Sequence, residues 1–199
     1  PSLMINIAAS PFSTKQQSKR TDVLRKNVLK YKLPLVYVNH VGAQTELIFD
    51  GDSRFLNANG ELVCQLPLFK ESVVTIDSLQ IHHNKAKDYT SIEKIHDALV
   101  LGIADYFKNL GLKKATLGLS GGIDSAVVCV LAARALGAQN VLPVLLPSQY
   151  THSNSVSEAE QLAKNLGCDY KIIPIKDVYD SFERELAPHF DGLKADVTE

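Results

Sequence analysis

Long hydrophobic runs, an excess of one charge and clustered cysteines are all missing from this sequence, and each absence excludes a class of protein. No apolar stretch approaches the ~20 residues that a membrane-spanning helix needs. The 21 basic and 22 acidic residues leave a net charge of −1, with neither a basic stripe nor an acidic tail. We therefore expect a protein that binds neither a membrane nor nucleic acid.

The three cysteines are Cys64, Cys129 and Cys168, and they form no CxxC pair and no Cys/His cluster with metal-ligand spacing. We predict that all three are buried structural thiols and that the protein works in the reducing cytoplasm. Hydrophobic residues make up 45% of the sequence, which is typical of a globular protein with a buried core. The chain begins at Pro1 without a signal-peptide leader, and we expect it to be the interior of a longer chain.

Residues 1–77 show mixed helix and strand patterns. Leu24, Val28 and Tyr31 have helical spacing and predict a helix over 18–32. The Asn59-Gly60 pair indicates a β-hairpin whose two central residues both adopt positive φ. Strand-like runs of apolar, β-branched or aromatic residues occupy 5–9, 35–38, 47–49, 53–57, 61–66 and 73–76. Residues 78–89 are polar and aperiodic, so we interpret them as a linker.

Residues 90–199 alternate between helix and strand patterns. Thr90 and Glu93 fit a capping box, and the amphipathic helix that follows is expected to end at Gly111. Strands are then predicted over 115–119, 141–146 and 169–175, and helices over 125–136, 153–166 and 177–186. This alternation predicts an α/β fold with right-handed crossovers and a parallel sheet covered on both faces.

A glycine turn, Ser120-Gly121-Gly122-Ile123-Asp124-Ser125, lies between the first strand and the first helix of this alternation. Ligands of open α/β sheets bind beyond the carboxyl ends of the strands. The two glycines remove side chains so that backbone N–H groups can close on an anion, and the helix N-terminus adds further donors. Ser120 and Ser125 add hydroxyl donors. Asp124 is compatible with a phosphate when Mg²⁺ lies between them, so we predict Mg²⁺ at Asp124.

The turn is neither a Walker A loop, which needs Gly-Lys-Ser/Thr, nor a G-x-G-x-x-G dinucleotide turn. A plain βα turn with a Ser or Asp N-cap would also select these residue types. The SGGxDS pattern after the first strand resembles the PP-loop of the N-type ATP pyrophosphatases, which have an adenine nucleotide α hydrolase-like fold. These enzymes cleave ATP between the α- and β-phosphates to adenylate a substrate. The resemblance implies ATP contacts at Gly118, Leu119, Ser120, Gly121, Gly122, Ile123, Asp124 and Ser125.

Two flanking segments narrow the resemblance, because the loop alone does not choose among NAD, GMP and asparagine synthetases and tRNA-thiolating enzymes. Residues 145–153 resemble the segment with which NAD synthetases line the nucleotide pocket. The first part resembles the end of a nitrilase-type glutaminase domain, after its nucleophilic cysteine. The matching pieces, in order, are 9–12, Arg20, 36–42, 49–53 and 59–62. A glutaminase followed by a PP-loop domain is the arrangement of the glutamine-dependent NAD⁺ synthetases.

That resemblance implies a two-site enzyme, with glutaminase residues over 1–77, the linker over 78–89 and synthetase residues over 90–199. Glutamine would supply ammonia, ATP would adenylate the carboxylate of deamido-NAD⁺ (nicotinic acid adenine dinucleotide), and ammonia would displace AMP. It also implies a homo-oligomer with at least a dimeric synthetase core. The glutaminase Glu, Lys and Cys triad should lie upstream of Pro1, so we assign no catalytic residue here and do not promote Cys64.

Two residues correspond to glutamine-binding positions. Ser10 matches a residue that helps to hold glutamine, whereas Gln16 stands where relatives carry a lysine, with Lys15 just before it. The alternative for Ser10 is an ordinary turn residue before Pro11. We expect this chain alone to be inactive in both reactions. The alternatives for the whole are another N-type ATP pyrophosphatase, GMP-forming or tRNA-thiolating, and a non-catalytic nucleotide-binding scaffold.

Overall fold

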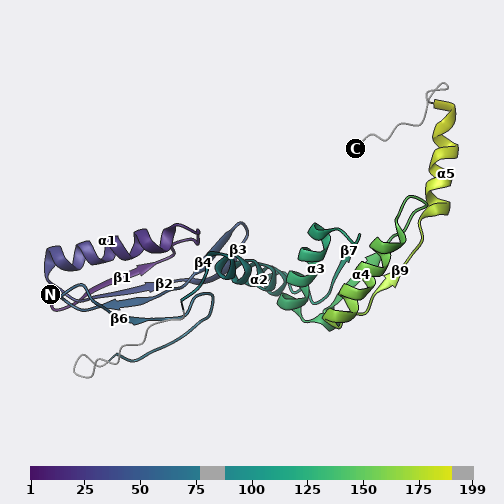
Figure 1. The fold of residues 1–199 in the computed structure, drawn as a ribbon. Helices are drawn as coiled ribbons and strands as arrows, with labels where there is room; N and C mark the ends of the chain where they lie inside the picture. Colours follow the sequence, from purple (N-terminus) through teal and green to yellow (C-terminus); the bar gives the residue numbers. More distant parts are fainter. Residues whose placement is uncertain (77–87, 190–199) are drawn as a thin grey trace. The chain divides into compact units, whose positions relative to one another are not determined.

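The computed structural model describes residues 1–76 and 88–189, and the chain divides into two compact units, Pro1–Leu112 and Lys113–Glu199 (Figure 1). Each unit has its own sheet and its own core. Within the described ranges no helix is long and apolar enough to cross a membrane. The predicted linker, 78–89, lies outside the described residues except for its last two positions.

The first unit contains a mixed four-stranded sheet in the order β1-β2-β5-β6, in which β1 and β2 are parallel and the other pairs antiparallel. Helix α1 joins β1 to β2 and packs Leu24 and Val28 against Leu35, Tyr37 and Leu56, so the predicted helical spacing is confirmed. The bounds are Met4–Ala8 for β1, Gln16–Tyr31 for α1, Leu35–Asn39 for β2, Arg54–Leu56 for β5 and Leu62–Gln65 for β6.

The predicted hairpin joins β5 to β6, but its turn differs from the expectation. Gly60 has a φ of +79°, whereas Asn59 is not among the residues with positive φ. The side chain of Asn57 accepts hydrogen bonds through Oδ1 from the N–H groups of Asn59 and Glu61, both at 3.0 Å. Because Asn57 satisfies these donors and the loop is longer than two residues, Asn59 keeps an ordinary backbone conformation.

The sequence prediction missed one strand and proposed another that does not form. A short hairpin of β3 (Val41–Gln44) and β4 (Leu47–Asp50) follows β2 directly. The strand-like run 73–76 forms no strand, and Val73 is 100% exposed. Strand propensity is realised only where a partner strand and a buried face are available, and neither is present in the described surroundings of Val73.

Helix α2 (Ser91–Asn109) packs against the β3–β4 hairpin inside the first unit. Its start has the predicted capping box, in which the Thr90 hydroxyl accepts from Glu93 N while the Glu93 carboxylate accepts from Thr90 N. Gly111, with a φ of +68°, lies just beyond its end, as predicted. Gly102 permits the close approach, since a Cβ there would lie 3.2 Å from Ile48 Cδ1.

The second unit contains a parallel three-stranded sheet in the order β7-β8-β9, with helices following the strands. The predicted alternation is confirmed, with shorter strands than expected. Gly137 and Gly167, both with positive φ, end the first two helices as the sequence predicted. The bounds are Ala115–Gly118 for β7, Ile123–Leu136 for α3, Val141–Leu145 for β8, Ser153–Leu166 for α4, Lys171–Ile172 for β9 and Lys176–Leu186 for α5.

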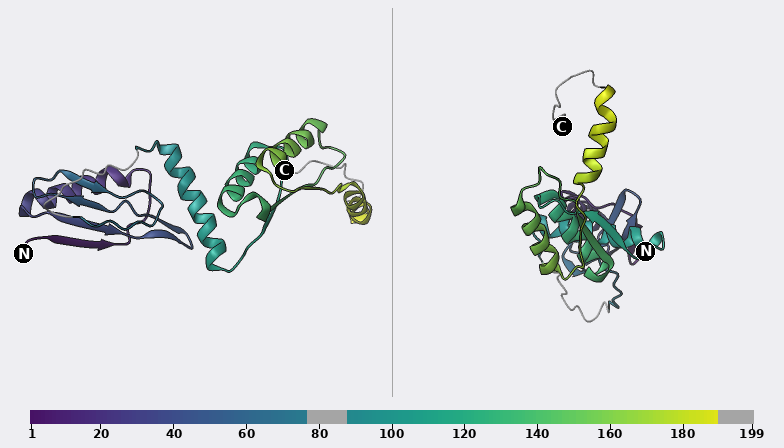
Figure 2. Two further views of the ribbon diagram at one scale, coloured as in Figure 1. Left: turned by 90° about the horizontal axis from the view of Figure 1, so that it is seen from below. Right: turned by 90° about the vertical axis from the view of Figure 1, so that its right-hand side faces the viewer.

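Helices α3 and α4 lie side by side on one face of this sheet (Figure 2). Leu119 and Leu145 share a core with Cys129 of α3 and Ala159 and Ala163 of α4. The expectation that both faces are covered differs from the described structure. Consecutive strand order places both right-handed crossovers on the same side, and covering the opposite face would require a reversal of strand order.

The three cysteines are free and buried, which confirms the prediction of structural thiols. Cys64 belongs to β6, and Cys129 in α3 is 0% exposed. Burial, together with the neighbouring Cys168, raises the pKa of Cys129 to about 11. A thiol that stays protonated is a poor nucleophile, which agrees with a structural role for Cys129.

Candidate functional site

The glycine turn, residues 118–125, lies where β7 passes into α3, beyond the carboxyl end of the strand. Gly122 is the N-cap of α3, and Ala126 N is the first to donate back, to Gly122 O. The N–H groups of Ile123, Asp124 and Ser125 lie in the first turn and have no intrahelical acceptor. The turn therefore presents backbone donors and the positive end of the helix dipole, as an anion site requires.

Two serine hydroxyls brace the turn from inside. Ser125 Oγ donates to Gly122 O at 3.0 Å and accepts from Ser120 N at 3.2 Å. Ser120 Oγ accepts from Gly122 N at 3.2 Å and lies 3.0 Å from Ser125 Oγ. These hydroxyls hold the shape of the turn, so Ser120 and Ser125, which were predicted as phosphate donors, also have a bracing role.

The glycines of the turn have different physical roles, which the sequence prediction treated as one. Gly121 has a φ of +84°, and a Cβ there would lie 2.4 Å from Ser155 O in the first turn of α4. Gly122 has an ordinary φ of −81°, and its Cβ would meet only Ser120 Oγ at 3.3 Å. Around Gly118 no heavy atom of the described chain lies within 4 Å of a Cβ position. Gly121 is thus the glycine that the fold requires, because it brings the first turns of α3 and α4 together.

Leu119 and Ile123, the two apolar residues of the turn, point in different directions. Leu119 is 2% exposed and packs in the core, while its N–H donates to Val144 O at 2.9 Å. Ile123 is 75% exposed at the first position of α3. Leu119 is therefore available to a ligand only through its backbone, whereas the Ile123 side chain borders the open side of the turn.

A small pocket of about 80 Å³ adjoins the turn at the carboxyl ends of β7 and β8. The loop after β8 is braced by Ser148 and Thr151, since Thr151 Oγ1 accepts from Ser148 N at 2.9 Å. The structure thus brings the predicted segment 145–153 to the same site as residues 118–125. The pocket is lined by Leu119, Ser120, Leu145, Leu146, Pro147, Thr151, Ser155 and Val156.

Asp124 lies in the first turn of α3 and is exposed. No group of three or more His, Cys, Asp or Glu side chains gathers anywhere in the described ranges. A single exposed carboxylate beside a turn of backbone N–H donors fits Mg²⁺ that arrives with a nucleotide, because Mg²⁺ is commonly held by one or two carboxylates together with substrate phosphates. It does not fit a metal that the protein holds by itself.

The two predicted glutamine-site residues lie in the first unit. Ser10, just after β1, is half-buried, and Arg20 Nη2 donates to its hydroxyl at 3.3 Å. Gln16 is exposed at the first position of α1, and its N–H donates to Ser13 O at 3.1 Å. In the described structure no hydrogen bond connects Gln16 with Ser10.

A buried charge network behind Ser10 escaped the sequence prediction. Arg20 donates to Asp50 at 3.0 and 3.1 Å and to Asp52 at 3.3 Å, while Arg54 pairs with Asp52. Burial opposes the charge of Arg20, but the hydrogen bond and the charge of Asp50 outweigh it and raise the pKa of the guanidinium. The available signal was the alternation Asp50-x-Asp52-x-Arg54 at the entry of a buried strand, where charges of both signs indicate an internal ion-pair network.

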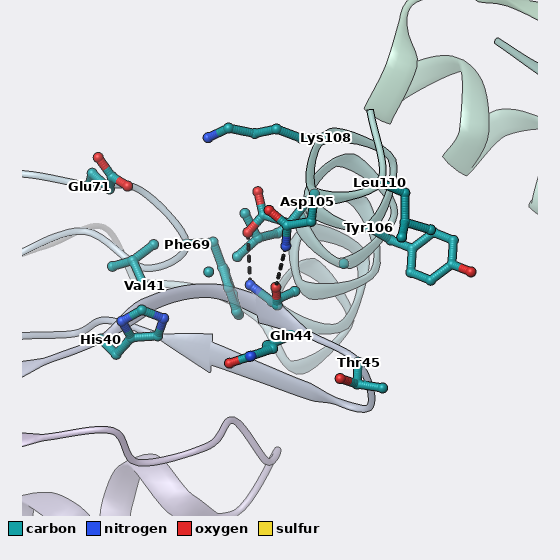
Figure 3. A pocket seen from close by; sticks show the side chains of 15 residues that line it. His40, Val41, Gln44, Thr45, Phe69, Glu71, Asp105, Tyr106, Lys108 and Leu110 are labelled. Carbon is teal, nitrogen blue, oxygen red and sulfur yellow. Dashed lines mark hydrogen bonds between the residues drawn. The ribbon is translucent and has the colours of Figure 1, made fainter. Parts of the chain in front are cut away.

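A second feature that the sequence did not reveal is the contact between α2 and the β3–β4 hairpin (Figure 3). Asp105 Oδ2 accepts from Ala43 N at 2.8 Å, and Asn109 Nδ2 donates to Ala43 O at 3.4 Å. An open cavity of about 670 Å³ borders this contact, with His40 and Glu71 among its lining residues. Polar side chains on a helix surface carry no sequence signal for the strand that they will meet.

The second unit is a parallel α/β domain, with a glycine turn and two helix N-termini at the carboxyl ends of adjacent strands. These features define its class as a parallel α/β protein with a glycine-rich βα turn. Within that class, the chain belongs to the NAD synthase family, which matches residues 95–197. The curated relatives are longer. A glutamine-dependent NAD⁺ synthetase of Synechocystis is 38% identical over 99% of this chain and 36% of its own length. One of Thermotoga maritima is 35% identical over 99% of this chain and 41% of its own.

Solved structures resemble both units. The glutamine-dependent NAD⁺ synthetase of Acinetobacter baumannii in complex with ADP is 34% identical, with a TM-score of 0.91 over 98% of this chain and 38% of that chain. A glutamine-dependent NAD⁺ synthetase of Cytophaga hutchinsonii has a TM-score of 0.83 at 17% identity over 96% of this chain and 39% of that chain, which establishes the shared fold. This chain therefore spans somewhat more than a third of the proteins that it matches.

Proposed function

We propose that this chain forms part of a glutamine-dependent NAD⁺ synthetase, an ATP-dependent amide-forming ligase, and that the turn 118–125 is its ATP site. The carboxylate of deamido-NAD⁺ attacks the α-phosphorus of ATP, and pyrophosphate leaves. Ammonia released from glutamine then attacks the acyl carbon of the adenylate, AMP leaves and NAD⁺ forms after loss of a proton. Glutamate is the by-product of the ammonia-releasing step.

The observation that carries this proposal is the contact of Gly121 with Ser155, which sets two helix N-termini and the turn around one point. Membership of the NAD synthase family supports the choice of substrate, and the ADP complex of the A. baumannii relative supports a nucleotide in this fold. The backbone donors of Ile123, Asp124 and Ser125 would hold the pyrophosphate portion of ATP. Fixed donors of this kind stabilise the charge that develops on the leaving group.

Mg²⁺ belongs to the proposal as the ion that accompanies ATP, with Asp124 as its ligand from this chain. When bound, it offsets phosphate charge and makes pyrophosphate a better leaving group. The position of Asp124 supports this role, because its exposed carboxylate lies one position before the Ser125 N–H donor. The carboxylate would otherwise repel the phosphates that the neighbouring backbone groups attract.

We further propose that the first unit is the end of a nitrilase-type glutaminase domain, with Ser10 and Gln16 facing glutamine. The proposed boundaries are 1–77 for this domain, 78–89 for the linker and 90–199 for the synthetase part. Helix α2 lies in the first compact unit, which extends to Leu112. It also lies mostly within the family match, which begins at residue 95. The proposed assembly is a homo-oligomer, which rests on the family resemblance. Its proposed location is the cytoplasm, which three free cysteines support.

The test uses the protein produced from its complete reading frame, with deamido-NAD⁺, Mg-ATP and either glutamine or ammonia. NAD⁺, AMP and pyrophosphate are expected in equal amounts with both nitrogen sources. Asp124→Ala should lower kcat with either source by roughly 10²-fold or more, as for the loss of one charge-stabilising group. Asp177→Ala, which removes the first-turn carboxylate of α5, is the matched control and should keep full activity. Formation of ADP and phosphate, or no NAD⁺ from either source, would contradict the proposal.

A further inference from the structure

Ser10 is held at three atoms by two side chains. Asn39 Oδ1 accepts from Ser10 N at 2.8 Å, and Asn39 Nδ2 donates to Ser10 O at 3.3 Å. Arg20 Nη2 donates to the Ser10 hydroxyl at 3.3 Å. The two backbone contacts are those that an ordinary turn residue would need. The contact of the hydroxyl with Arg20 goes beyond that need.

The side chains that hold Ser10 are themselves fixed. Asn39 is 6% exposed, and its Nδ2 also donates to Asp50 Oδ1 at 3.0 Å. Arg20 is 7% exposed and forms a two-pronged contact with the same carboxylate. Asp50, which is 1% exposed, therefore fixes the side chains of both Asn39 and Arg20. Charge-assisted contacts that are shielded from water are strong and directional, so Ser10 has little freedom to turn.

The hydrogen-bond direction at Ser10 follows from this arrangement. A guanidinium can only donate, so the Ser10 oxygen is the acceptor toward Arg20, and its proton must point elsewhere. Tyr37 is the internal neighbour of this hydroxyl: burial raises the pKa of Tyr37, and a side-chain hydrogen bond with Ser10 opposes that rise. The Ser10 hydroxyl is therefore held between Arg20 and Tyr37, while Ser10 stays half-buried and can still contact a ligand.

We propose that Asn39 and Arg20 are positioning residues for glutamine, which hold Ser10 in the place from which it contacts that substrate. This inference rests on the proposed glutaminase function of the first unit. It assigns the specificity for glutamine to a buried Asn39–Asp50–Arg20 cluster that lies behind the residue in contact with substrate. Loss of the Asn39 or Arg20 side chain should weaken glutamine binding and leave ammonia-driven synthesis unchanged.

The experiment compares glutamine and ammonia as nitrogen sources in the protein from its complete reading frame. Asn39→Ala should raise KM for glutamine about tenfold, the equivalent of about 1.4 kcal/mol. The rate with ammonia and the KM for ATP should stay within twofold of the unaltered protein. Ser10→Ala should show the same separation, because it removes the hydroxyl that Arg20 holds.

Ser53→Ala is the matched control, because Ser53 Oγ accepts from Asn39 N at 3.0 Å without contacting Ser10. It perturbs the same cluster but leaves the three contacts of Ser10 in place, so KM for glutamine should not change. If Asn39→Ala does not fold, Asn39→Ser takes its place, because a serine keeps a polar group beside Asp50 yet is too short to reach both atoms of Ser10.

Three results separate the possible failures. An unchanged KM for glutamine in the folded Asn39 variant would overturn the positioning role. An equal loss of activity with glutamine and with ammonia would reduce Asn39 to a purely structural residue and also overturn it. Absence of NAD⁺ from either nitrogen source in the unaltered protein would instead remove the proposed function on which the inference rests.

Discussion

Gly121 and Gly118 belong to the same short motif, yet only one of them is required by the geometry of the backbone. Gly121 combines a φ of +84° with a Cβ position 2.4 Å from Ser155 O, so any side chain would force α3 and α4 apart. Gly118 has neither constraint in the described structure. The sequence motif assigns both glycines to the ligand, whereas the structure shows that Gly121 also allows α3 and α4 to pack closely.

We predict that Gly121→Ala destabilises the second unit by about 1–3 kcal/mol, the typical cost of a strained backbone position, and weakens Mg-ATP binding because the two helix N-termini no longer converge. Gly118→Ala is the matched control and should leave the thermal unfolding midpoint within a degree or so of the unaltered protein. Differential scanning calorimetry and titration with Mg-ATP measure the two effects. Equal behaviour of the two variants would argue against the packing role of Gly121.

At the scale of elements, the β3–β4 hairpin depends on α2 through both main-chain groups of Ala43. We predict that Asp105→Ala leaves Ala43 N without its acceptor and costs about 1 kcal/mol, since the pair is only partly buried. Amide hydrogen exchange at residues 41–50 should speed up accordingly.

Asp105→Asn serves as the control for this contact, because an amide oxygen at the same position can still accept from Ala43 N. Its exchange rates should match those of the unaltered protein. If the hairpin amides of Asp105→Ala stay as protected from hydrogen exchange as before, the apolar contact of Gly102 with Ile48 is sufficient to hold the two elements together.

The elements that the sequence predicted well are those whose signal is local. The capping box at Thr90, the glycine ends of α2, α3 and α4, and the apolar strands β7 and β8 all depend on neighbours within a few positions. Strand β3 was missed because the β3–β4 hairpin is held by α2, whose Asp105 is 62 residues from Ala43 in the sequence. The turn 118–125 was predicted as a site, but the Arg20–Asp50–Asn39 cluster was not, because it joins residues from three separate elements.

On the scale of the whole molecule, the chain consists of two units with separate cores, and its cysteines are distributed between them. Cys64 is buried in the first unit, and Cys129 and Cys168 are buried in the second. A buried thiol reacts only when its surroundings open, so these three residues report the unfolding of each unit separately.

We predict that saturating Mg-ATP protects Cys129 and Cys168 from thiol-labelling reagents during heating while leaving Cys64 unaffected. A ligand that binds only the folded form stabilises it by about 2.7 kcal/mol at a concentration 100 times its Kd, and the turn 118–125 lies in the second unit alone. Labelling by a maleimide across a temperature series, followed by peptide mass spectrometry, gives one midpoint for each cysteine.

In Asp124→Ala the protection of the second unit should disappear, because the ligand to Mg²⁺ is lost while the core around Cys129 is untouched. Equal protection of Cys64 would mean that the two units unfold as one and that their separate cores do not make them separate cooperative units.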